Sequence, residues 1–431
     1  MDKQTITLGL AGFGTVGSGL ARIIEENKEW IARRIGKKLV IKHILVRDKD
    51  KVRPFVPGPE AKFTTEAEEL LADPETDILV ELMGGTDAAR EFITRALEAG
   101  KHVVTANKAL LAEEGGSLFD LAEKKGRALY YEASVAGGIP IVQTLRDSLA
   151  GNRIKSLTGI LNGTANYILS EMTTTGVDFS AALEMAKAKG YAEADPTLDI
   201  EGIDAGHKLA ILIRLAHGQN YPFKSLPVEG ISAVSPADIE LAKEFGYILK
   251  LIAQVKEKSG RLQAGVHPVF LPQDHILAKV DGPFNSILLN GNAVGPIMLY
   301  GQGAGDLPTG SAVLADILAL ARDERHPNNT GFLENPLPDA DILDPELTVS
   351  GHYFRFTVQD RPGVLSALSG ILGENNISIA QAVQRQDNED KSVPVVFFTH
   401  QALMRDVSRA LKEISSFDFI NAPTVHYRII K

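Results

Sequence analysis

The sequence predicts an α/β protein with three parts: an N-terminal domain built on a parallel sheet, a central α+β domain and a small C-terminal α+β domain. Three observations predict this class. Strand and helix patterns alternate over the first third of the chain, longer helices replace them after residue 139, and residues 349–431 follow the order strand, helix, strand, strand, helix, strand. The alternation indicates a sheet with helices on both faces, and the last order is that of a ferredoxin-like domain.

The glycine spacing after the first expected strand predicts a nucleotide site. A short apolar strand at residues 5–10 is followed by Gly12-x-Gly14-x-x-Gly17, which leads into a helical pattern at 16–34. In a Rossmann-type dinucleotide-binding domain, such glycines permit a tight turn, close approach to the pyrophosphate and close helix–strand packing, and the phosphates lie at a helix N-terminus. Glycines also serve ordinary turns, so a purely structural turn is the alternative.

The other elements of the first domain follow from apolar runs bounded by polar residues. Strands are expected at 39–46, 77–83, 102–106 and 128–133, helices at 87–99 and 110–125, and a surface loop at 47–59. We expect this domain to cover residues 1–134, with a helix at 307–325 returning to it.

A segment of linker-like composition separates the central and C-terminal domains. The central domain is expected at 135–306, with strands at 154–161 and 248–255. Residues 326–348 form the expected linker, because the stretch 323–347 holds four prolines and several acids. In the C-terminal domain, 349–431, strands are expected at 353–358, 377–385, 393–399 and 424–430, and helices at 363–374 and 402–414.

The composition argues against several classes of protein. A net charge of -10 argues against a general binder of nucleic acid or anionic membranes. The absence of cysteine excludes disulfides, thiolate nucleophiles and thiolate-bound metals. The sequence enters its first strand without a signal-peptide pattern, and no apolar run is long enough to span a bilayer. We therefore expect a cytoplasmic protein without membrane or nucleic-acid partners.

The end of the second expected strand bears on the choice of cofactor. An acid there binds the ribose 2′-hydroxyl of NAD, whereas an arginine accommodates the 2′-phosphate of NADP. Arg47 and Lys49 follow this strand and favour NADP, while Asp48 between them leaves NAD open. The alternative interpretation is a solvated run of charges in a loop.

Polar residues also follow the next two expected strands. Ligands of open α/β sheets bind at this edge, outside the carboxyl ends of the strands. Gly84-Gly85-Thr86 follows the first of these strands and Lys108 follows the second. Lys108 could bind substrate or cofactor, or could simply begin a helix, and its position alone does not separate the two.

The densest group of charged residues lies between 189 and 208. Glu193, Asp199 and Asp204 precede an apolar helix, and Asp204 and Lys208 are spaced i, i+4. This spacing places both on one helix face, which apolar neighbours would partly bury, so Lys208 could donate a proton. The alternative is a surface ion pair that contributes roughly a few tenths of a kcal/mol.

Six stretches of the chain match one family pattern. They are residues 9–20 (GLAGFGTVGSGL), 104–112 (VTANKALLA), 131–142 (YEASVAGGIPIV), 161–169 (LNGTANYIL), 186–212 (AKAKGYAEADPTLDIEGIDAGHKLAIL) and 300–316 (YGQGAGDLPTGSAVLAD). Together they resemble the homoserine dehydrogenase family over nearly the whole chain, and the long central block is the most specific. The C-terminal domain resembles an ACT domain, with Asp360-Arg361-Pro362-Gly363-Val364-Leu365 at its first strand–helix junction.

The resemblance implies an activity and a set of residue roles. The family reduces L-aspartate 4-semialdehyde to L-homoserine with NAD(P)H, on the route to threonine, methionine and isoleucine. The substrate ammonium needs carboxylates, and the developing alkoxide needs a cation. The implied catalytic residues are Lys208 as proton donor, Lys108 between nicotinamide and substrate, and Asp204, and the implied substrate-binding residues are Glu193, Asp199 and Asp204.

The resemblance also implies positions for a cofactor, a cation and partners. Threonine is the expected effector of the ACT domain, and a homodimer or homotetramer is the expected assembly. A monovalent cation, usually sodium in the family, is expected on backbone carbonyls at Glu132, Val135, Gly137 and Ile139. The cofactor, NADP or NAD with NADP favoured, is expected at Gly12, Phe13, Gly14, Thr15, Val16, Gly17, Arg47, Lys49, Gly84, Lys108, Gly190 and Gly305.

Two other functions would share part of this sequence pattern. Another two-domain NAD(P) oxidoreductase would share the glycine fingerprint but would not explain the block from Glu193 to Lys208. An amino-acid sensor with an inactive first domain would be expected to lack Lys108 or Lys208, and both are present. An assay with homoserine and a nicotinamide cofactor separates the two enzyme functions.

Overall fold

The chain forms two compact units in a computed structural model that describes residues 4–53, 55–322, 329–384 and 392–430. Hydrophobic cores lie within both units. None of the helices in these ranges combines the length and apolarity that crossing a membrane requires. The first unit comprises Met1–Gly163, Ile203–Leu226 and Pro283–Ala340, and the second comprises Thr164–Gly202, Pro227–Gly282 and Asp341–Lys431.

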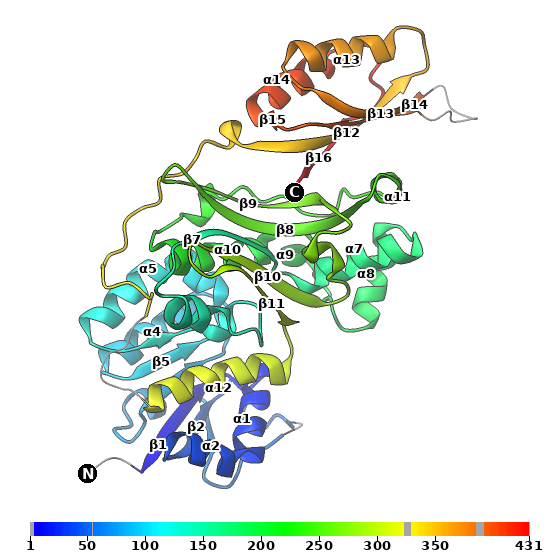
Figure 1. Cartoon of the computed structure of the whole chain (residues 1–431). Helices are drawn as coiled ribbons and strands as arrows, with labels where there is room; N and C mark the ends of the chain where they lie inside the picture. The colour runs from blue at the N-terminus through cyan, green and yellow to red at the C-terminus, as the bar shows by residue number, and fades with distance from the viewer. Residues whose placement is uncertain (1–3, 54, 323–328, 385–391, 431) are drawn as a thin grey trace. The chain divides into compact units, whose positions relative to one another are not determined.

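The first unit contains a six-stranded parallel sheet in the order β3-β2-β1-β4-β5-β6, of which β1, β2 and β5 are labelled in Figure 1. This is the strand order of dinucleotide-binding domains, so the predicted Rossmann-type fold is confirmed. The strands are β1 (Thr5–Ala11), β2 (Lys38–Leu45), β3 (Lys62–Thr64), β4 (Ile78–Glu81), β5 (His102–Thr105) and β6 (Leu129–Tyr130).

Helices pack against this sheet, including one that returns from far along the chain. A Cβ atom on Gly19 would lie 2.3 Å from the carbonyl oxygen of Asp306, so α1 and α12 approach backbone to backbone. Val313 and Ile317 of α12 share the core with Leu8 of β1. The helices are α1 (Thr15–Glu26), α2 (Lys28–Ile35), α3 (Glu68–Leu71), α4 (Asp87–Glu98), α5 (Lys108–Lys124) and α12 (Asp306–Arg322).

One local prediction for this domain was wrong, and one strand was missed. The helix predicted over 16–34 breaks at Asn27, whose φ of -109° and ψ of 15° are not helical. Asparagine favours caps over helix interiors because its side chain competes for backbone hydrogen bonds. The strand β3 was not predicted, because three residues are too few to display a strand period.

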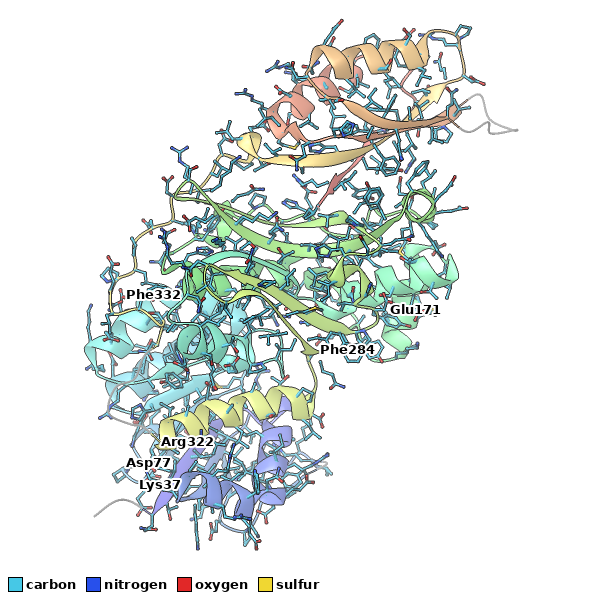
Figure 2. All side chains as sticks on the ribbon, viewed as in Figure 1. Lys37, Asp77, Glu171, Phe284, Arg322 and Phe332 are labelled. Carbon is cyan, nitrogen blue, oxygen red and sulfur yellow. The ribbon has the colours of Figure 1, made fainter. Side chains whose placement is uncertain are left out.

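The first unit also holds a buried helix and an antiparallel group of strands. β10 (Phe284–Gly291) pairs with both β7 (Ile154–Ile160) and β11 (Gly295–Gln302). At the start of β10, the ring of Phe284 (labelled in Figure 2) stacks on Tyr300 with centroids 5.1 Å apart. α10 (Ile203–His217) contacts α5 and β7 and is buried from Asp204 to Ala216. Short helical turns complete this part: η1 (Glu132–Ser134), α6 (Ile141–Gln143), η2 (Thr144–Ser148) and η3 (Phe223–Ser225).

The second unit is built on the sheet order β8-β9-β16-β12-β14-β13, with β15 paired to β12. Its last strands and helices confirm the predicted ferredoxin-like order. They are β12 (Val349–Gln359), α13 (Val364–Glu374), β13 (Ile379–Gln384), β14 (Ser392–Thr399), β15 (Ala402–Leu403), α14 (Met404–Ile414) and β16 (Val425–Ile429). The elements before them are α7 (Gly163–Thr175), α8 (Phe179–Ala188), α9 (Thr197–Ile200), α11 (Pro236–Glu244), β8 (Tyr247–Lys258), β9 (Arg261–Pro272), η4 (Ile276–Lys279) and η5 (Pro345–Leu347).

The C-terminal domain shares a sheet and an aromatic cluster with the hairpin β8–β9. β16 pairs in parallel with β9, with Arg428 opposite Val269. Phe270 of β9 is fully buried, and its ring centroid lies 4.9 Å from that of Tyr353 and 5.3 Å from that of Tyr427. The domain is therefore integrated into the second unit through its strands.

The segment predicted as a linker forms hydrogen bonds with other parts of the chain over much of its described length. Leu129 N donates to Asn329 Oδ1 at 2.7 Å, and Asn220 N donates to Pro338 O at 2.8 Å. Further along, Leu343 N donates to Leu262 O at 2.9 Å. Residues 323–328, which include the end of the predicted returning helix and the start of the predicted linker, lie outside the described residues, as does the predicted strand end at 385.

Candidate active site

A buried carboxylate joins two lysines in the first unit. Asp204, in the first turn of α10, accepts a hydrogen bond from Lys208 Nζ through Oδ2 at 2.6 Å, and its Oδ1 lies 3.1 Å from Lys108 Nζ. Asp204 is 5% exposed and Lys208 is 8% exposed. The i, i+4 pair is therefore a buried one, and the alternative of a surface ion pair was wrong. Lys108 is the first residue of α5 and is only partly buried.

The charges of this cluster favour an anionic ligand. Burial opposes ionisation of Asp204, but the charges of Lys208 and Lys108 and hydrogen bonds from Lys208 and Asn162 outweigh it, so its pKa lies well below the usual range. One carboxylate thus faces two ammonium groups. The surplus positive charge, held on fixed side chains, can stabilise an oxygen that becomes negative during a reaction.

The Lys208 ammonium has a second fixed partner, the carbonyl oxygen of Leu161, at 2.8 Å. The same carbonyl accepts from Asn285 Nδ2 at 3.0 Å, and Asn162 Nδ2 donates to Asp204 Oδ2 at 2.8 Å. An ammonium carries three donors, so these two bonds orient the group and leave one N–H for a ligand. Sequence reasoning missed both asparagines. Asn162 lies within residues 161–169, which match the family pattern, whereas Asn285 is 124 residues from its partner and gives no local signal.

The carboxyl ends of β4 and β5 are tied together next to Lys108. Buried Glu81 accepts a hydrogen bond from Thr105 Oγ1 at 2.6 Å, and its burial raises its pKa. Asn107 Nδ2 donates to Gly85 O at 2.6 Å. Asn107 Oδ1 accepts from Leu110 N, so Asn107 is the N-cap of α5. These contacts fix the start of α5, so the two polar stretches that follow neighbouring strands do lie together.

The glycine fingerprint occupies the turn between β1 and α1. Gly12 has a φ of 107°, and a Cβ there would lie 2.4 Å from Leu82 O. A Cβ on Gly17 would lie 2.6 Å from Gly12 O. Gly14 caps α1 without any side-chain hydrogen bond, and a Cβ on it would meet nothing within 4 Å. The N–H groups of Thr15 and Val16 thus begin an open helix N-terminus, which fits a pyrophosphate.

The remaining predicted cofactor residues of the first unit lie in loops and turns. Phe13 is buried edge-on against Phe63, with centroids 5.3 Å apart. Gly84 and Gly305 have φ values of 74° and 128° and precede α4 and α12 respectively. Such positive φ values favour glycine.

Arg47 and Lys49 are exposed in the loop that follows β2. Arg53, which sequence reasoning missed, folds over the same loop. Its guanidinium donates to Lys51 O at 2.7 Å and lies 4.5 Å from the centroid of the Phe63 ring. A basic residue stacked on an aromatic ring thus shapes the loop that carries Arg47.

Three predicted residues belong to the second unit. Gly190, with a φ of 75°, turns the chain after α8, Glu193 is exposed, and Asp199 lies in α9. The loop between them is anchored, because Tyr191 O accepts from Thr164 Oγ1 at 2.6 Å. Lys108, Asp204 and Lys208 all lie in the first unit.

The residues predicted to hold a cation share one buried loop: Glu132, Val135, Gly137 and Ile139. The Glu132 carboxylate accepts from Val142 N at 2.8 Å and from Gln143 N at 2.7 Å. No cluster of three or more His, Asp or Glu suited to a metal occurs in the part of the chain that the structure describes. The loop contains backbone carbonyl oxygens, the kind of ligand that suits a monovalent cation.

A Rossmann-type domain beside a lysine–carboxylate cluster defines a nicotinamide-dependent oxidoreductase. Comparison with known families identifies the particular family of oxidoreductases. The family profile described as homoserine dehydrogenase matches residues 140–318, the homoserine dehydrogenase NAD binding domain matches 12–132, and the ACT domain matches 352–416. The chain belongs to the homoserine dehydrogenase family.

Similar proteins support this assignment along the whole chain. The sequence is 41% identical over 431 residues to a homoserine dehydrogenase of Neisseria gonorrhoeae. The aligned region covers 99% of each of the two chains. The crystal structure of a homoserine dehydrogenase from Thiobacillus denitrificans superposes with a TM-score of 0.93 at 40% identity, covering 100% of this chain and 99% of that one. A hyperthermophilic archaeal homoserine dehydrogenase mutant in complex with NADPH has a TM-score of 0.61 at 30% identity, covering 73% of this chain and 97% of that one.

Proposed function

We propose that this chain catalyses the reversible reduction of L-aspartate 4-semialdehyde to L-homoserine, with Lys208 as the proton donor. The observation that carries the proposal is the buried Lys208 ammonium, held 2.6 Å from Asp204 and 2.8 Å from Leu161 O. Because these partners fix two of its donors, the third can point at a substrate oxygen.

In this proposal, each side chain of the cluster has a different role in the reaction. Lys208 gives its proton to the aldehyde oxygen during reduction and takes it back during oxidation, while Asp204 holds the ammonium in place. Lys108 adds positive charge beside the same carboxylate. Glu193 and Asp204 bind the substrate ammonium through their carboxylates, and Asp199 supports them. The nicotinamide, when bound, supplies or accepts the hydride.

NADP is the proposed preferred cofactor. Arg47 and Lys49 are exposed at the end of β2, where a 2′-phosphate would lie. The archaeal relative was solved in complex with NADPH, which supports this choice. A sodium ion on the carbonyls of the 132–139 loop is the proposed monovalent cation.

Threonine is the proposed effector, bound at the turn between β12 and α13. Gly363, with a φ of 92°, caps α13 there, and Arg361 forms an ion pair with Asp418 at 2.6 Å that holds the turn. We further propose a homodimer or homotetramer in the cytoplasm, and a division into domains at 1–134 with 307–325, 135–306 and 349–431, joined by the linker 326–348.

Initial rates with L-homoserine test the proposal. We expect cofactor reduction that is faster with NADP than with NAD and that threonine slows. L-serine and a sugar alcohol are matched controls, because both offer a hydroxyl without the homoserine chain length. Turnover of a control substrate without turnover of homoserine would show that the chain is a different oxidoreductase.

A further inference from the structure

Asn285 is a buried polar side chain of the first unit. It is fully buried near the start of β10, and its Oδ1 has no hydrogen-bond partner among the described residues. A buried amide with an unsatisfied oxygen is unfavourable compared with an apolar side chain of the same shape. Leucine has the same branching at Cγ, so stability alone would favour leucine at this position.

The surrounding backbone is nevertheless shaped to admit this amide. A Cβ on Gly303 would lie 2.2 Å from Asn285 Cγ, so only glycine leaves room for the side chain in this position. A Cβ on Gly163 would lie 3.6 Å from Asn285 Oδ1. Asn285 is therefore enclosed between two glycines, and one of them lies two residues from Gly305, a proposed cofactor residue.

The donor side of the amide reaches the catalytic cluster. Nδ2 donates to Leu161 O at 3.0 Å, and the same oxygen accepts from Lys208 Nζ at 2.8 Å. We infer that Asn285 is a positioning residue: it fixes the carbonyl that orients the Lys208 ammonium toward the substrate oxygen. This inference rests on the proposed role of Lys208 as proton donor.

The physical effect follows from how an ammonium is oriented. Lys208 Nζ can rotate about its last carbon–carbon bond, and two acceptors, one from Asp204 and one from Leu161, define the direction of its third N–H. If the Leu161 carbonyl moves, the third N–H swings away from the reacting oxygen. Misplacement of about 1 Å can cost roughly 100-fold in rate, whereas substrate binding by carboxylates elsewhere is untouched.

The test compares two Asn285 variants with a matched buried asparagine. Asn285→Leu removes the donor at constant shape, and Asn285→Asp replaces it with an acceptor that repels the carbonyl. Asn166→Leu is the control, because Asn166 is also fully buried and donates to backbone carbonyls, at 3.0 Å to Val280 O and 2.8 Å to Gly282 O, and these carbonyls are not the one that accepts from Lys208. Each variant is assayed by homoserine oxidation with NADP. The rate is divided by the concentration of folded protein, which circular dichroism determines.

We expect both Asn285 variants to lose roughly ten-fold or more in kcat, with homoserine KM and the Kd of NADPH changed less than about two-fold. The solvent deuterium isotope effect on kcat should rise, because proton transfer becomes slower relative to other steps. Asn166→Leu should leave that isotope effect unchanged, whatever it does to stability. This split separates positioning from packing.

Several outcomes would overturn the inference. Wild-type kcat and isotope effect in Asn285→Leu would do so, as would a loss of activity that only follows the loss of folded protein in both Asn285 variants. Lys208→Met separates the two proposals. If it keeps wild-type turnover, the proposed proton donor is wrong, but if it loses turnover while Asn285→Leu does not, only the role of Asn285 is wrong.

Discussion

Asp238 of α11 and Arg355 of β12 form a bidentate ion pair, with Nε 2.6 Å from one carboxylate oxygen and Nη2 2.9 Å from the other. Asp238 is fully buried, and its Oδ1 also accepts from Tyr353 OH at 2.7 Å. The ACT domain is thus attached to the elements before it by a charge pair as well as by its strands.

The first prediction concerns this attachment. Arg355→Met leaves the buried Asp238 carboxylate without its counter-charge, which costs about 3–5 kcal/mol for a buried pair. The double variant Asp238→Leu/Arg355→Met should lose much less, because no buried charge is left unpaired. Denaturant unfolding measures both. Equal losses in the single and double variants would mean that packing, and not charge, holds the domain.

The second prediction concerns the proton donor. Lys208→Met keeps the aliphatic stem and removes the ammonium, so the fold and NADPH binding should stay near normal while kcat falls by roughly 100- to 10,000-fold. Steady-state kinetics and fluorescence titration of NADPH measure these effects. Turnover at the wild-type level would contradict the role.

The third prediction concerns the cofactor. If Arg47 binds the 2′-phosphate, Arg47→Ala should weaken NADP binding by about 1.5–3 kcal/mol, typical of a charge-assisted contact, and spare NAD. Dissociation constants for the two cofactors measure this difference. Lys51→Ala, in the same loop, is a control. Equal losses with both cofactors in Arg47→Ala would assign Arg47 to loop structure.

The features that were predicted correctly from the sequence depend on residues that lie close together in the chain. The glycine fingerprint gave the turn that Gly12 and Gly17 form, because both positions are constrained by sterics that the spacing reveals. The i, i+4 spacing gave the contact of Asp204 with Lys208 for the same reason. The resemblance to a family pointed to Lys108 of α5, whose Nζ lies 3.1 Å from Asp204 Oδ1, whereas the role of Asp199 in α9 stays a prediction.

Contacts between distant segments could not be predicted. The amide of Asn285 meets Leu161 only because β10 lies beside β7, and nothing in the sequence around Asn285 signals that pairing. The contacts of the predicted linker also join segments that are far apart in the sequence. Proline and acid content predicts an exposed segment, but it does not show that Asn329 bonds to Leu129.

The fourth prediction concerns pH and two buried histidines. His352 Nδ1 lies 2.9 Å from His426 Nε2, and burial lowers the pKa of His352 to about 4 and that of His426 to about 3. Both therefore stay neutral in the folded protein at pH values where the unfolded chain, with a histidine pKa of about 6.5, binds protons. Stability should be fully present above about pH 6.5 and fall as the pH drops toward 4.

Each such histidine contributes a slope of about 1.4 kcal/mol per pH unit within this window. His352→Phe should therefore reduce the slope of unfolding free energy against pH between about 5 and 6. Denaturant unfolding at several pH values measures it. His400→Phe, which changes an exposed histidine, is the control, and an unchanged slope in His352→Phe would contradict the assignment.

The last prediction concerns regulation. Arg428 of β16 lies 3.0 and 3.2 Å from the two carboxylate oxygens of Glu229. Burial opposes ionisation of Glu229, but His267 and Arg428 outweigh it and lower its pKa to about 2. Two residues on, Ile231 N donates at 2.7 Å to the carbonyl oxygen of Ile200, the last residue of α9. A continuous set of contacts therefore runs from the ACT domain to the helix that carries Asp199.

Removing the whole ACT domain would be a poor test of this route, because Phe270 would lose the aromatic rings that bury it. Glu229→Gln is a gentler change that keeps size and removes the charge. An effector acts only by binding two states differently, so weakening the link should raise the threonine concentration needed for inhibition several-fold while leaving activity without threonine near wild type. Glu257→Gln, at the exposed end of β8, is the control. Unchanged inhibition in Glu229→Gln would show that the effector signal takes another path.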